Sequence, residues 1–203
     1  SAGIQAATTG AAQIGSSSRV LKPEEKANVK EFVIAKDGIA IIVNPANTVA
    51  DLKIEDIKKI FAGQVTNWKQ VGGPDQEISV ITREAGSGTR GAMEELVMGK
   101  DSPISNKAIV QNSTGGVRTA VASDPRAVGY VSAASVNKEV KAVKVEGQEP
   151  STANIGSGAY KISRPFIYLT KGEPAGAVKT FIDYVLSAEG QALLEKEGLV
   201  KVK

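Results

Sequence analysis

Residues 78–90, with the sequence ISVITREAGSGTR, constrain the fold of this chain more than any other segment. The apolar, β-prone start predicts a strand, and apolar residues at helical spacing after the loop predict a helix. Between them, Ser87 and Thr89 are suited to begin a helix, while Gly86 and Gly88 allow the backbone to approach another group closely. The segment therefore predicts a strand that turns directly into a helix N-terminus.

Such a helix N-terminus is suited to hold an anion. Its first backbone N–H groups have no intrahelical partner and carry a partial positive charge. Arg83, four residues before Ser87, can add a rigid fork of N–H donors. Backbone amides, two hydroxyls and one guanidinium together predict a site for a small tetrahedral oxyanion. The alternative is an ordinary strand-to-helix turn with a good cap, and the segment lacks the G-K-[S/T] ending of a nucleotide-binding loop.

The composition excludes several classes of function. The 203 residues include no cysteine and no histidine, which removes thiol nucleophiles, histidine bases and the usual zinc ligands. The acidic residues show no metal-loop spacing, so we expect no metal and no cofactor. With a net charge of only +3, scattered lysines and 4% aromatic residues, nucleic-acid binding is not expected.

The order of predicted elements indicates an α/β protein. Apolar runs at residues 32–43 and 164–170 predict strands, and amphipathic helices are predicted at 52–62 and 178–186. This alternation of strands and helices predicts largely parallel sheets. The polar residues 36–38 interrupt the first run and predict a turn between two extended segments.

Seven motifs, in order along nearly the whole chain, resemble one family. They are GSSSR (15–19), DGIAIIVNPAN (37–47), IFAGQVTNW (60–68), TREAGSGTR (82–90), AVGYVS (127–132), YKISRPFIYLT (160–170) and FIDYVLSAEGQ (181–191). On these motifs the chain resembles the phosphate-binding proteins of phosphate ABC importers. The resemblance implies an α/β fold of the type II periplasmic-binding-protein class, in which two lobes are joined by crossing hinge strands and the ligand lies in the cleft between the lobes.

The resemblance also implies how the chain is divided between the lobes. Residues 37–43 and 164–170 would be the hinge strands. Lobe I would combine residues 1–36 with residues 171–203, and lobe II would span residues 44–163. Closure of the lobes by a hinge motion would then bury the anion.

The phosphate contacts of the family carry over to particular residues. Four residues match the anion loop of lobe II, as the residues themselves had suggested, namely Arg83, Ser87, Gly88 and Thr89. Within GSSSR, either Ser17 or Ser18 matches the hydroxyl contact from lobe I, whereas the alternative for this serine run is a solvated turn.

Two features depart from the family pattern. The family begins with a strand, a phosphate loop, a helix and a second strand, and residues 1–4 resemble the point just after this unit. We therefore expect the unit to exist as a separate chain or cleaved fragment, or to have been left out of the sequence. Ser18 also stands where some relatives have an aspartate, and Ala85 where relatives often have an acid. Because such an acceptor favours protonated phosphate over sulfate, selectivity stays open.

Several other residues are candidates for a role. The run at residues 113–116, STGG, precedes a predicted helix and is a possible second anion loop, although such a run usually only caps a helix. We hypothesise that Arg19 and Arg90 pair with carboxylates across the cleft. Trp68 and Tyr130 are expected to be packing residues.

On this resemblance we expect a non-enzymatic solute-binding protein that captures inorganic phosphate and delivers it to the membrane permease of an ABC importer. The location implied is periplasmic or extracellular, with the intact protein often held at the membrane as a lipoprotein. The alternatives are binding of another oxyanion, such as sulfate, molybdate or tungstate, and a surface or signalling protein that reuses the fold. A phosphoryl-transfer enzyme is not favoured, since histidine, a nucleotide-binding loop and paired metal carboxylates are absent.

Overall fold

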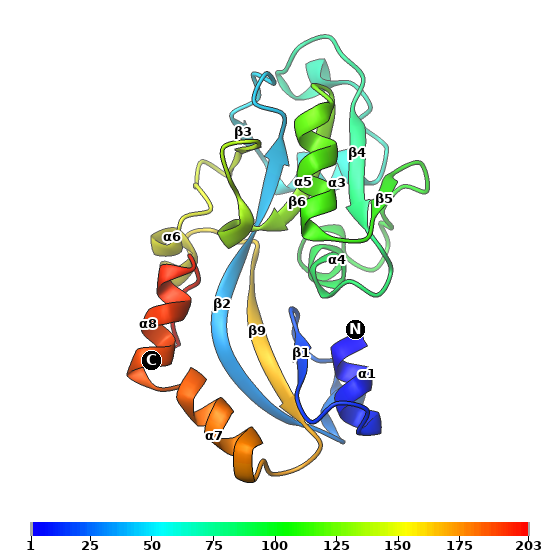
Figure 1. Ribbon diagram of the computed structural model, residues 1–203. Helices are drawn as coiled ribbons and strands as arrows, with labels where there is room; N and C mark the ends of the chain where they lie inside the picture. Colours follow the sequence, from blue (N-terminus) through cyan, green and yellow to red (C-terminus); the bar gives the residue numbers. More distant parts are fainter. Residues whose placement is uncertain (1, 203) are drawn as a thin grey trace.

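The computed structural model describes residues 2–202 as two lobes joined by two long strands (Figure 1). The helices are α1 (Ala2–Thr9), α2 (Pro23–Lys26), α3 (Ile54–Phe61), α4 (Gly88–Met93), α5 (Thr114–Ser123), α6 (Thr152–Ser157), α7 (Gly176–Val185) and α8 (Ala188–Lys196). Two 3₁₀ turns, η1 (Trp68–Val71) and η3 (Ala133–Ser135), and a π-helical turn, η2 (Glu94–Met98), complete the helical segments. The strands are β1 (Gly15–Ser17), β2 (Lys30–Val43), β3 (Asp51–Leu52), β4 (Ser79–Arg83), β5 (Ile109–Gln111), β6 (Ala127–Ser132), β7 (Lys141–Ala142), β8 (Lys144–Val145) and β9 (Ser163–Thr170).

Strand β2 runs through both lobes and connects them. The smaller lobe includes α1, β1, α2, α7 and α8, and the larger lobe includes α3 to α6 and β3 to β8 (Figure 1). Its first part, up to Gly38, pairs antiparallel with β9, and its second part, from Ile39 onward, pairs antiparallel with β6. The turn predicted at residues 36–38 is therefore wrong, because the backbone stays extended through these residues. A charged residue such as Asp37 favours an exposed turn when its charge has no partner. Here its carboxylate forms an ion pair with Arg164, directly opposite on β9, so it can stay in an extended strand.

The main sheet is mixed, with the strand order β1-β9-β2-β6-β4-β5 and with β7 also paired to β2. Strand β4 pairs parallel with β5 and β6, but all pairings of β1, β2 and β9 are antiparallel. The prediction of largely parallel sheets is wrong for this reason. Alternation of strands and helices identifies crossovers inside a lobe, whereas β2 leaves the smaller lobe and β9 returns to it in the opposite direction.

The larger lobe buries its sheet on both faces. Ile39, Ile41 and Val43 belong to a core that includes α3 and η2, while Ala40 and Ile42 belong to a second core with α5. This division follows from the alternation of side chains along a strand. Trp68 is fully buried and donates its indole N–H to the Arg126 carbonyl at 2.9 Å, which confirms that it is a packing residue.

The smaller lobe has a smaller core, formed by residues of α1, β9 and the segment after β1, namely Ile4, Ala7, Leu21, Ile167 and Leu169. Helix α1 lies unusually close to β1, because a Cβ atom on Gly3 would come within 2.0 Å of the Ser16 carbonyl oxygen. On the other side, α7 and α8 lie along β2 and β9 (Figure 1). Gln191 of α8 donates its amide to the Ile34 carbonyl of β2 at 2.9 Å and so anchors the helix to the shared strand.

Residues 2–202 contain neither a helix suited to cross a bilayer nor a cluster of metal-ligating side chains. No helix in this range combines the length and the apolar character that crossing a bilayer requires. The same residues include no cluster of three or more histidine, cysteine or acidic side chains that is arranged to hold a metal ion.

Candidate anion-binding site

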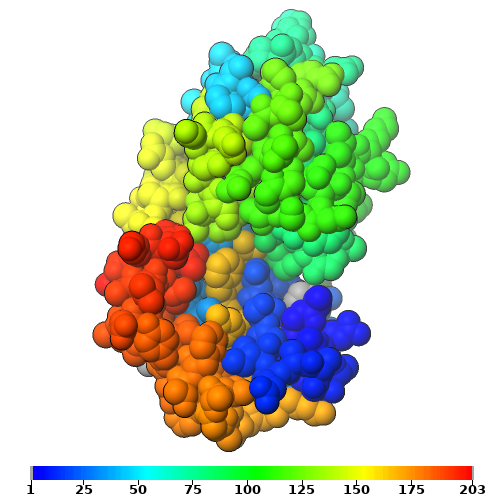
Figure 2. Space-filling view, in the orientation of Figure 1, coloured from blue at the N-terminus to red at the C-terminus, as the bar shows by residue number. Residues whose placement is uncertain are grey.

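The N-terminus of α4 contacts the turn after β1 at the interface between the lobes, which we call the seam. A Cβ atom added to Gly88 would lie 3.2 Å from the backbone nitrogen of Ser18 and 3.2 Å from its Cβ atom. In the space-filling view, the dark-blue N-terminal segment lies directly below the green segment that includes α4 (Figure 2). The two loops that the sequence suggested as anion contacts, one from each lobe, are therefore neighbours.

The local geometry of α4 leaves donors available at its start. Ser87 is the N-cap residue, and its hydroxyl oxygen accepts a hydrogen bond from the Arg90 backbone N–H at 3.2 Å. The hydroxyl hydrogen of Ser87 is not used by this bond. Gly88 opens the helix and Thr89 is buried beside it. This arrangement is that of a helix start whose amides and hydroxyls can meet an anion.

Arg83 lies at the end of β4, and its guanidinium is held by two neighbours. Its Nε and one terminal nitrogen donate to the Glu84 carboxylate at 2.8 and 2.9 Å, and the other terminal nitrogen donates to the Thr114 hydroxyl at 3.3 Å. These bonds use three of the five N–H groups of a guanidinium, which leaves two for a ligand. The same pairing lowers the pKa of Glu84 below its ordinary value.

Tyr130 supports the backbone at this point. Its hydroxyl lies 2.8 Å from the Thr82 hydroxyl and accepts from the Arg83 backbone N–H at 3.3 Å. The side chain is buried and its ring packs edge-on against Phe61. This confirms Tyr130 as a core residue, and burial raises the pKa of its hydroxyl.

The two candidate serines of the smaller lobe have different surroundings. Ser17 is buried, and its hydroxyl donates to the Arg19 carbonyl at 3.0 Å, so this side chain is engaged within its own turn. Ser18 lies against Gly88, and its carbonyl accepts from Arg164 at 3.2 Å. Of the two, Ser18 is thus the residue that faces the start of α4. The serine run is not a fully solvated turn.

The hypothesis of arginine–carboxylate pairs across the cleft is wrong. Arg19 forms two hydrogen bonds with Glu25 at 2.8 and 2.7 Å, and Arg90 pairs with Glu94 at 2.8 Å. Each carboxylate lies in the same segment as its arginine, six or four residues along the chain, so each pair closes locally before a residue of the other lobe is needed.

The run at residues 113–116 forms the start of α5 and acts mainly as its cap. Ser113 accepts from the Gly116 backbone N–H at 2.9 Å, as an N-cap residue does. Thr114 contributes differently, because it accepts the Arg83 hydrogen bond described above. The run therefore reaches the candidate site through Arg83.

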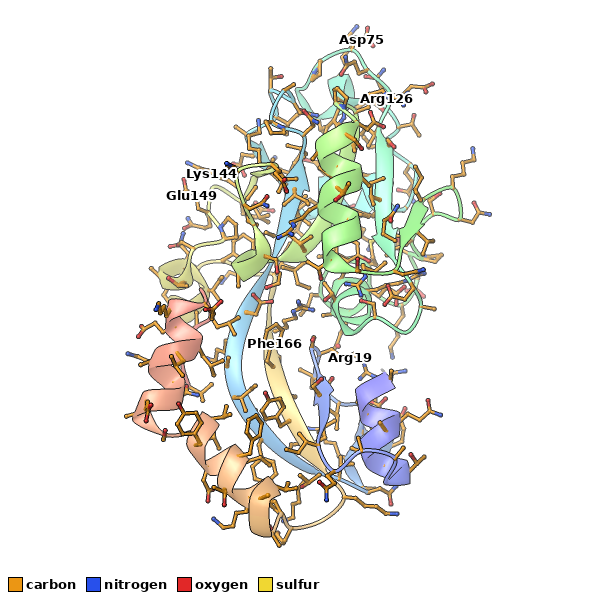
Figure 3. The ribbon with its side chains drawn as sticks, viewed as in Figure 1. Arg19, Asp75, Arg126, Lys144, Glu149 and Phe166 are labelled. Carbon is orange, nitrogen blue, oxygen red and sulfur yellow. The ribbon has the colours of Figure 1, made fainter. Side chains whose placement is uncertain are left out.

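A cavity of about 770 Å³ lies beside this seam, between residues 19–24 of the smaller lobe and residues 85–100 of the larger lobe. Of the six predicted site residues, only Ser87 lines it. The charged side chains around it have both signs and include Arg19, Lys22, Lys100, Glu24, Glu94 and Glu95. Figure 3 shows Arg19 at the edge of the smaller lobe, next to this opening. The cavity adjoins the predicted anion contacts and does not coincide with them.

Sequence reasoning missed Asp37 and Arg164 as residues of the site region. They form a buried ion pair at 3.0 Å, and Arg164 also bonds Ser18. Burial raises the pKa of Asp37 and lowers that of Arg164, and their mutual attraction opposes both shifts. The available signal was a charged residue next to the apolar run of each strand, Asp37 in β2 and Arg164 in β9.

A family model described as a PBP superfamily domain matches residues 1–189. The phosphate-binding protein PstS of Bacillus subtilis is 32% identical over 205 residues, which is 98% of this chain and 68% of that protein. PstS of Borreliella burgdorferi is 31% identical over 203 residues, covering 94% of this chain and 73% of that protein. The chain belongs to the PstS family of phosphate-binding proteins.

Solved structures of phosphate transport proteins agree with the fold. A phosphate ABC transporter substrate-binding protein from Clostridium perfringens, solved with bound phosphate, is 44% identical with a TM-score of 0.96, over 100% of this chain and 84% of that chain. An ABC-type phosphate transport receptor from Vibrio cholerae is 41% identical with a TM-score of 0.83, over 98% of this chain and 84% of that chain. The two-lobed α/β fold expected from the sequence is thereby confirmed.

The chain is shorter than its PstS relatives. It spans 68% of the Bacillus subtilis protein and 73% of the Borreliella burgdorferi protein, while PstS 2 of Streptococcus agalactiae matches 61% of this chain at 46% identity, over 45% of that protein. The expectation that an N-terminal unit exists as a separate chain gains no support from these relatives.

Proposed function

We propose that this chain is the solute-binding component of a phosphate ABC importer. It captures inorganic phosphate between its two lobes outside the cytoplasm, in the periplasm or at the cell surface, and delivers the ion to a membrane permease. The protein performs no chemical step and needs no cofactor or metal. Attachment to the membrane, as in lipoprotein members of the family, belongs to the same proposal.

The observation that carries the proposal is the contact between Gly88 and Ser18 at the lobe seam. It joins the start of α4, where the backbone N–H groups of Gly88 and Thr89 have no hydrogen-bond partner among residues 2–202, to a polar turn of the other lobe. Arg83 lies at the other end of the same loop, and two of its five N–H groups make no hydrogen bond among the residues that the structure describes. A tetrahedral anion held by these groups would receive charge-assisted hydrogen bonds, which are about twice as strong as neutral ones. The relative from Clostridium perfringens was solved with bound phosphate, which supports the same ligand here.

The proposed contacts are the guanidinium of Arg83, the amides and hydroxyls of the α4 start and the turn of the smaller lobe. The residues are Arg83, Ser87, Gly88, Thr89, Ser18 and, through its role in the turn, Ser17. The proposed lobe division is residues 1–36 with 171–203 for lobe I, residues 44–163 for lobe II, and 37–43 with 164–170 for the hinge strands. Affinity would come from several such bonds in a cleft that excludes water as the lobes close.

The test is calorimetric titration of phosphate into the protein at neutral pH, repeated with sulfate and molybdate. We expect one phosphate per chain and no displacement by sulfate. Arg83→Gln should weaken phosphate binding about 10- to 100-fold, since hydrogen bonds to a charged group contribute roughly 1.5–3 kcal/mol. The matched control is Arg126→Gln, because Arg126 is an exposed arginine in a local ion pair at the far end of the larger lobe (Figure 3).

Three results would contradict the proposal in different ways. Equal binding of sulfate or molybdate would reassign the ligand to another oxyanion. Binding of none of these anions would favour a protein that reuses the fold for another purpose. Tight phosphate binding that Arg83→Gln and Arg126→Gln leave equally intact would move the site away from the α4 start.

A further inference from the structure

The strands that join the lobes carry a fully buried ion pair at their crossover. Asp37 of β2 and Arg164 of β9 are directly opposite each other in the ladder, with Nε and one terminal nitrogen of Arg164 at 3.2 and 3.0 Å from the same carboxylate oxygen. Their side chains are 0% and 2% exposed. One residue further along, at Gly38, β2 makes its last pairing with β9 before it pairs with β6 in the larger lobe.

This pair is bonded to both lobes. The second oxygen of Asp37 accepts from the Ser132 hydroxyl at 2.8 Å, and Ser132 is the last residue of β6 in the larger lobe. The remaining terminal nitrogen of Arg164 donates to the carbonyl of Ser18 at 3.2 Å, in the turn of the smaller lobe. One ion pair thus connects the two crossing strands, the end of β6 and the turn that faces α4.

Stability does not account for such a pair. Replacing a buried ion pair by apolar residues of similar volume is often neutral or stabilising, because the pair must first lose its hydration. The guanidinium carbon of Arg164 also lies 5.1 Å from the centre of the Phe166 ring, a cation–π contact that an apolar side chain would replace by packing on the same ring. Figure 3 shows Phe166 on β9, midway between the lobes. What an apolar pair would lack is the donor to Ser18 and the acceptor for Ser132.

We propose that Arg164 is a positioning residue for the anion site: clamped by Asp37, it holds the Ser18 carbonyl and thereby fixes the turn of the smaller lobe against Gly88. We call the Asp37–Arg164 pair with its bond to Ser18 the clamp. The hydrogen bond from Ser132 to Asp37 links this clamp to the larger lobe. The position of the turn is therefore coupled to the orientation of the lobes. The choice of phosphate as the ligand rests on the proposed function, whereas the clamp itself rests on contacts within this chain.

The first test compares the wild-type protein with the double variant Asp37→Leu/Arg164→Met, which keeps the side-chain volume close to the original and removes both polar bonds. We expect a protein that still folds cooperatively. Its phosphate dissociation constant should rise about 10- to 100-fold, as expected when a preorganised set of charge-assisted bonds is loosened. Backbone amides of residues 17–19 should exchange hydrogen at least about tenfold faster in the absence of any anion.

The second variant, Arg164→Lys, keeps the charge and tests the geometry. An ammonium on a flexible stem cannot reproduce the fork that reaches Asp37 and Ser18 together. We expect exchange at residues 17–19 to rise and phosphate affinity to fall, with a smaller change than in the double variant. Ser132→Ala removes the hydrogen bond from the larger lobe to Asp37 and should also weaken phosphate affinity. Arg126→Met is the matched control, with wild-type exchange and affinity expected.

The outcomes separate the two proposals. If the wild-type protein binds no phosphate, the proposed function fails, and faster exchange at residues 17–19 in the variants still supports the clamp. If phosphate binds and the folded variants show wild-type affinity and wild-type exchange, the clamp is overturned while the function stands. If the double variant does not fold, exchange and affinity of Arg164→Lys decide, and wild-type values for both overturn the clamp.

Discussion

Gly91 of α4 lies against the side chain of Arg19 from the smaller lobe. A Cβ atom on Gly91 would lie 3.1 Å from Cδ and 3.4 Å from Nε of Arg19. Arg19 has little freedom to move aside, because Glu25 binds its guanidinium through two hydrogen bonds and the Val20 carbonyl accepts a third. The close approach of the lobes at this point therefore depends on the absence of a side chain at residue 91.

We predict that Gly91→Ala weakens phosphate binding about tenfold. The added methyl group would require the bonded Arg19 side chain, or the lobe that carries it, to shift by a few tenths of an ångström, and overpacking of a tight contact typically costs about 1–3 kcal/mol. Calorimetry measures the affinity, and small-angle scattering measures whether the phosphate-bound protein is less compact. The control is Gly156→Ala in α6, where the new Cβ would meet Val200 only at an ordinary 3.4 Å. Both substitutions raise helix propensity by about 1 kcal/mol, so equal affinities would show that the seam tolerates the methyl group.

The buried ion pair predicts a non-additive effect on stability. Arg164→Met alone leaves the Asp37 carboxylate buried without its partner and should lower the free energy of unfolding by about 3–5 kcal/mol. Adding Asp37→Leu should recover most of this loss. Urea denaturation of both single variants and the double variant measures the coupling. Additive losses in the double variant would mean that the two charges do not depend on each other.

The Tyr130 hydroxyl should contribute measurably to folding. Tyr130→Phe leaves the Thr82 hydroxyl and the Arg83 backbone N–H without their buried partner, so we expect a loss of about 1–3 kcal/mol in unfolding free energy. Thr82→Val removes the other side of the pair, and the double variant should cost less than the sum. A cycle with no coupling energy would show that the hydroxyl contact at 2.8 Å has no energetic weight.

The Arg19–Glu25 pair predicts a specific acid dependence. Hydrogen bonding from Arg19 lowers the pKa of Glu25 to about 2, from an ordinary value of 4.5. A carboxyl with a depressed folded-state pKa stabilises the fold above its unfolded value, and this stabilisation is lost as the pH falls through the folded value. Wild-type protein should therefore be more stable than Glu25→Gln by about 1 kcal/mol or less at pH 6, given the partial exposure of the pair. The difference should shrink between pH 5 and about pH 2.

Thermal unfolding over that pH range measures the difference between the two proteins. Glu24→Gln is the control, because Glu24 is exposed and makes no ion pair with the residues that the structure describes. A constant gap between wild type and Glu25→Gln down to pH 2 would be inconsistent with the depressed pKa.

Much of the anion loop could be predicted from residue types alone. A strand followed by Ser87, Gly88 and Thr89 can hardly avoid forming a helix start with free amides, since these properties are local. The structure has that helix start, and the comparisons confirm the family and the two-lobed fold. The lobe boundaries and the ligand contacts remain predictions.

What the sequence could not determine depends on which strands meet. Asp37 looked like a turn residue, and only the ladder shows that Arg164 lies opposite it, 127 residues along the chain. Arg19 looked free to reach across the cleft until the fold of the next few residues brought Glu25 to it. By itself the sequence determined the helix start and the identity of its donors, because those follow from local propensity and residue chemistry. Tertiary structure alone decided the partners of the charged residues, because an ion pair forms with whichever opposite charge the folded chain brings within about 4 Å.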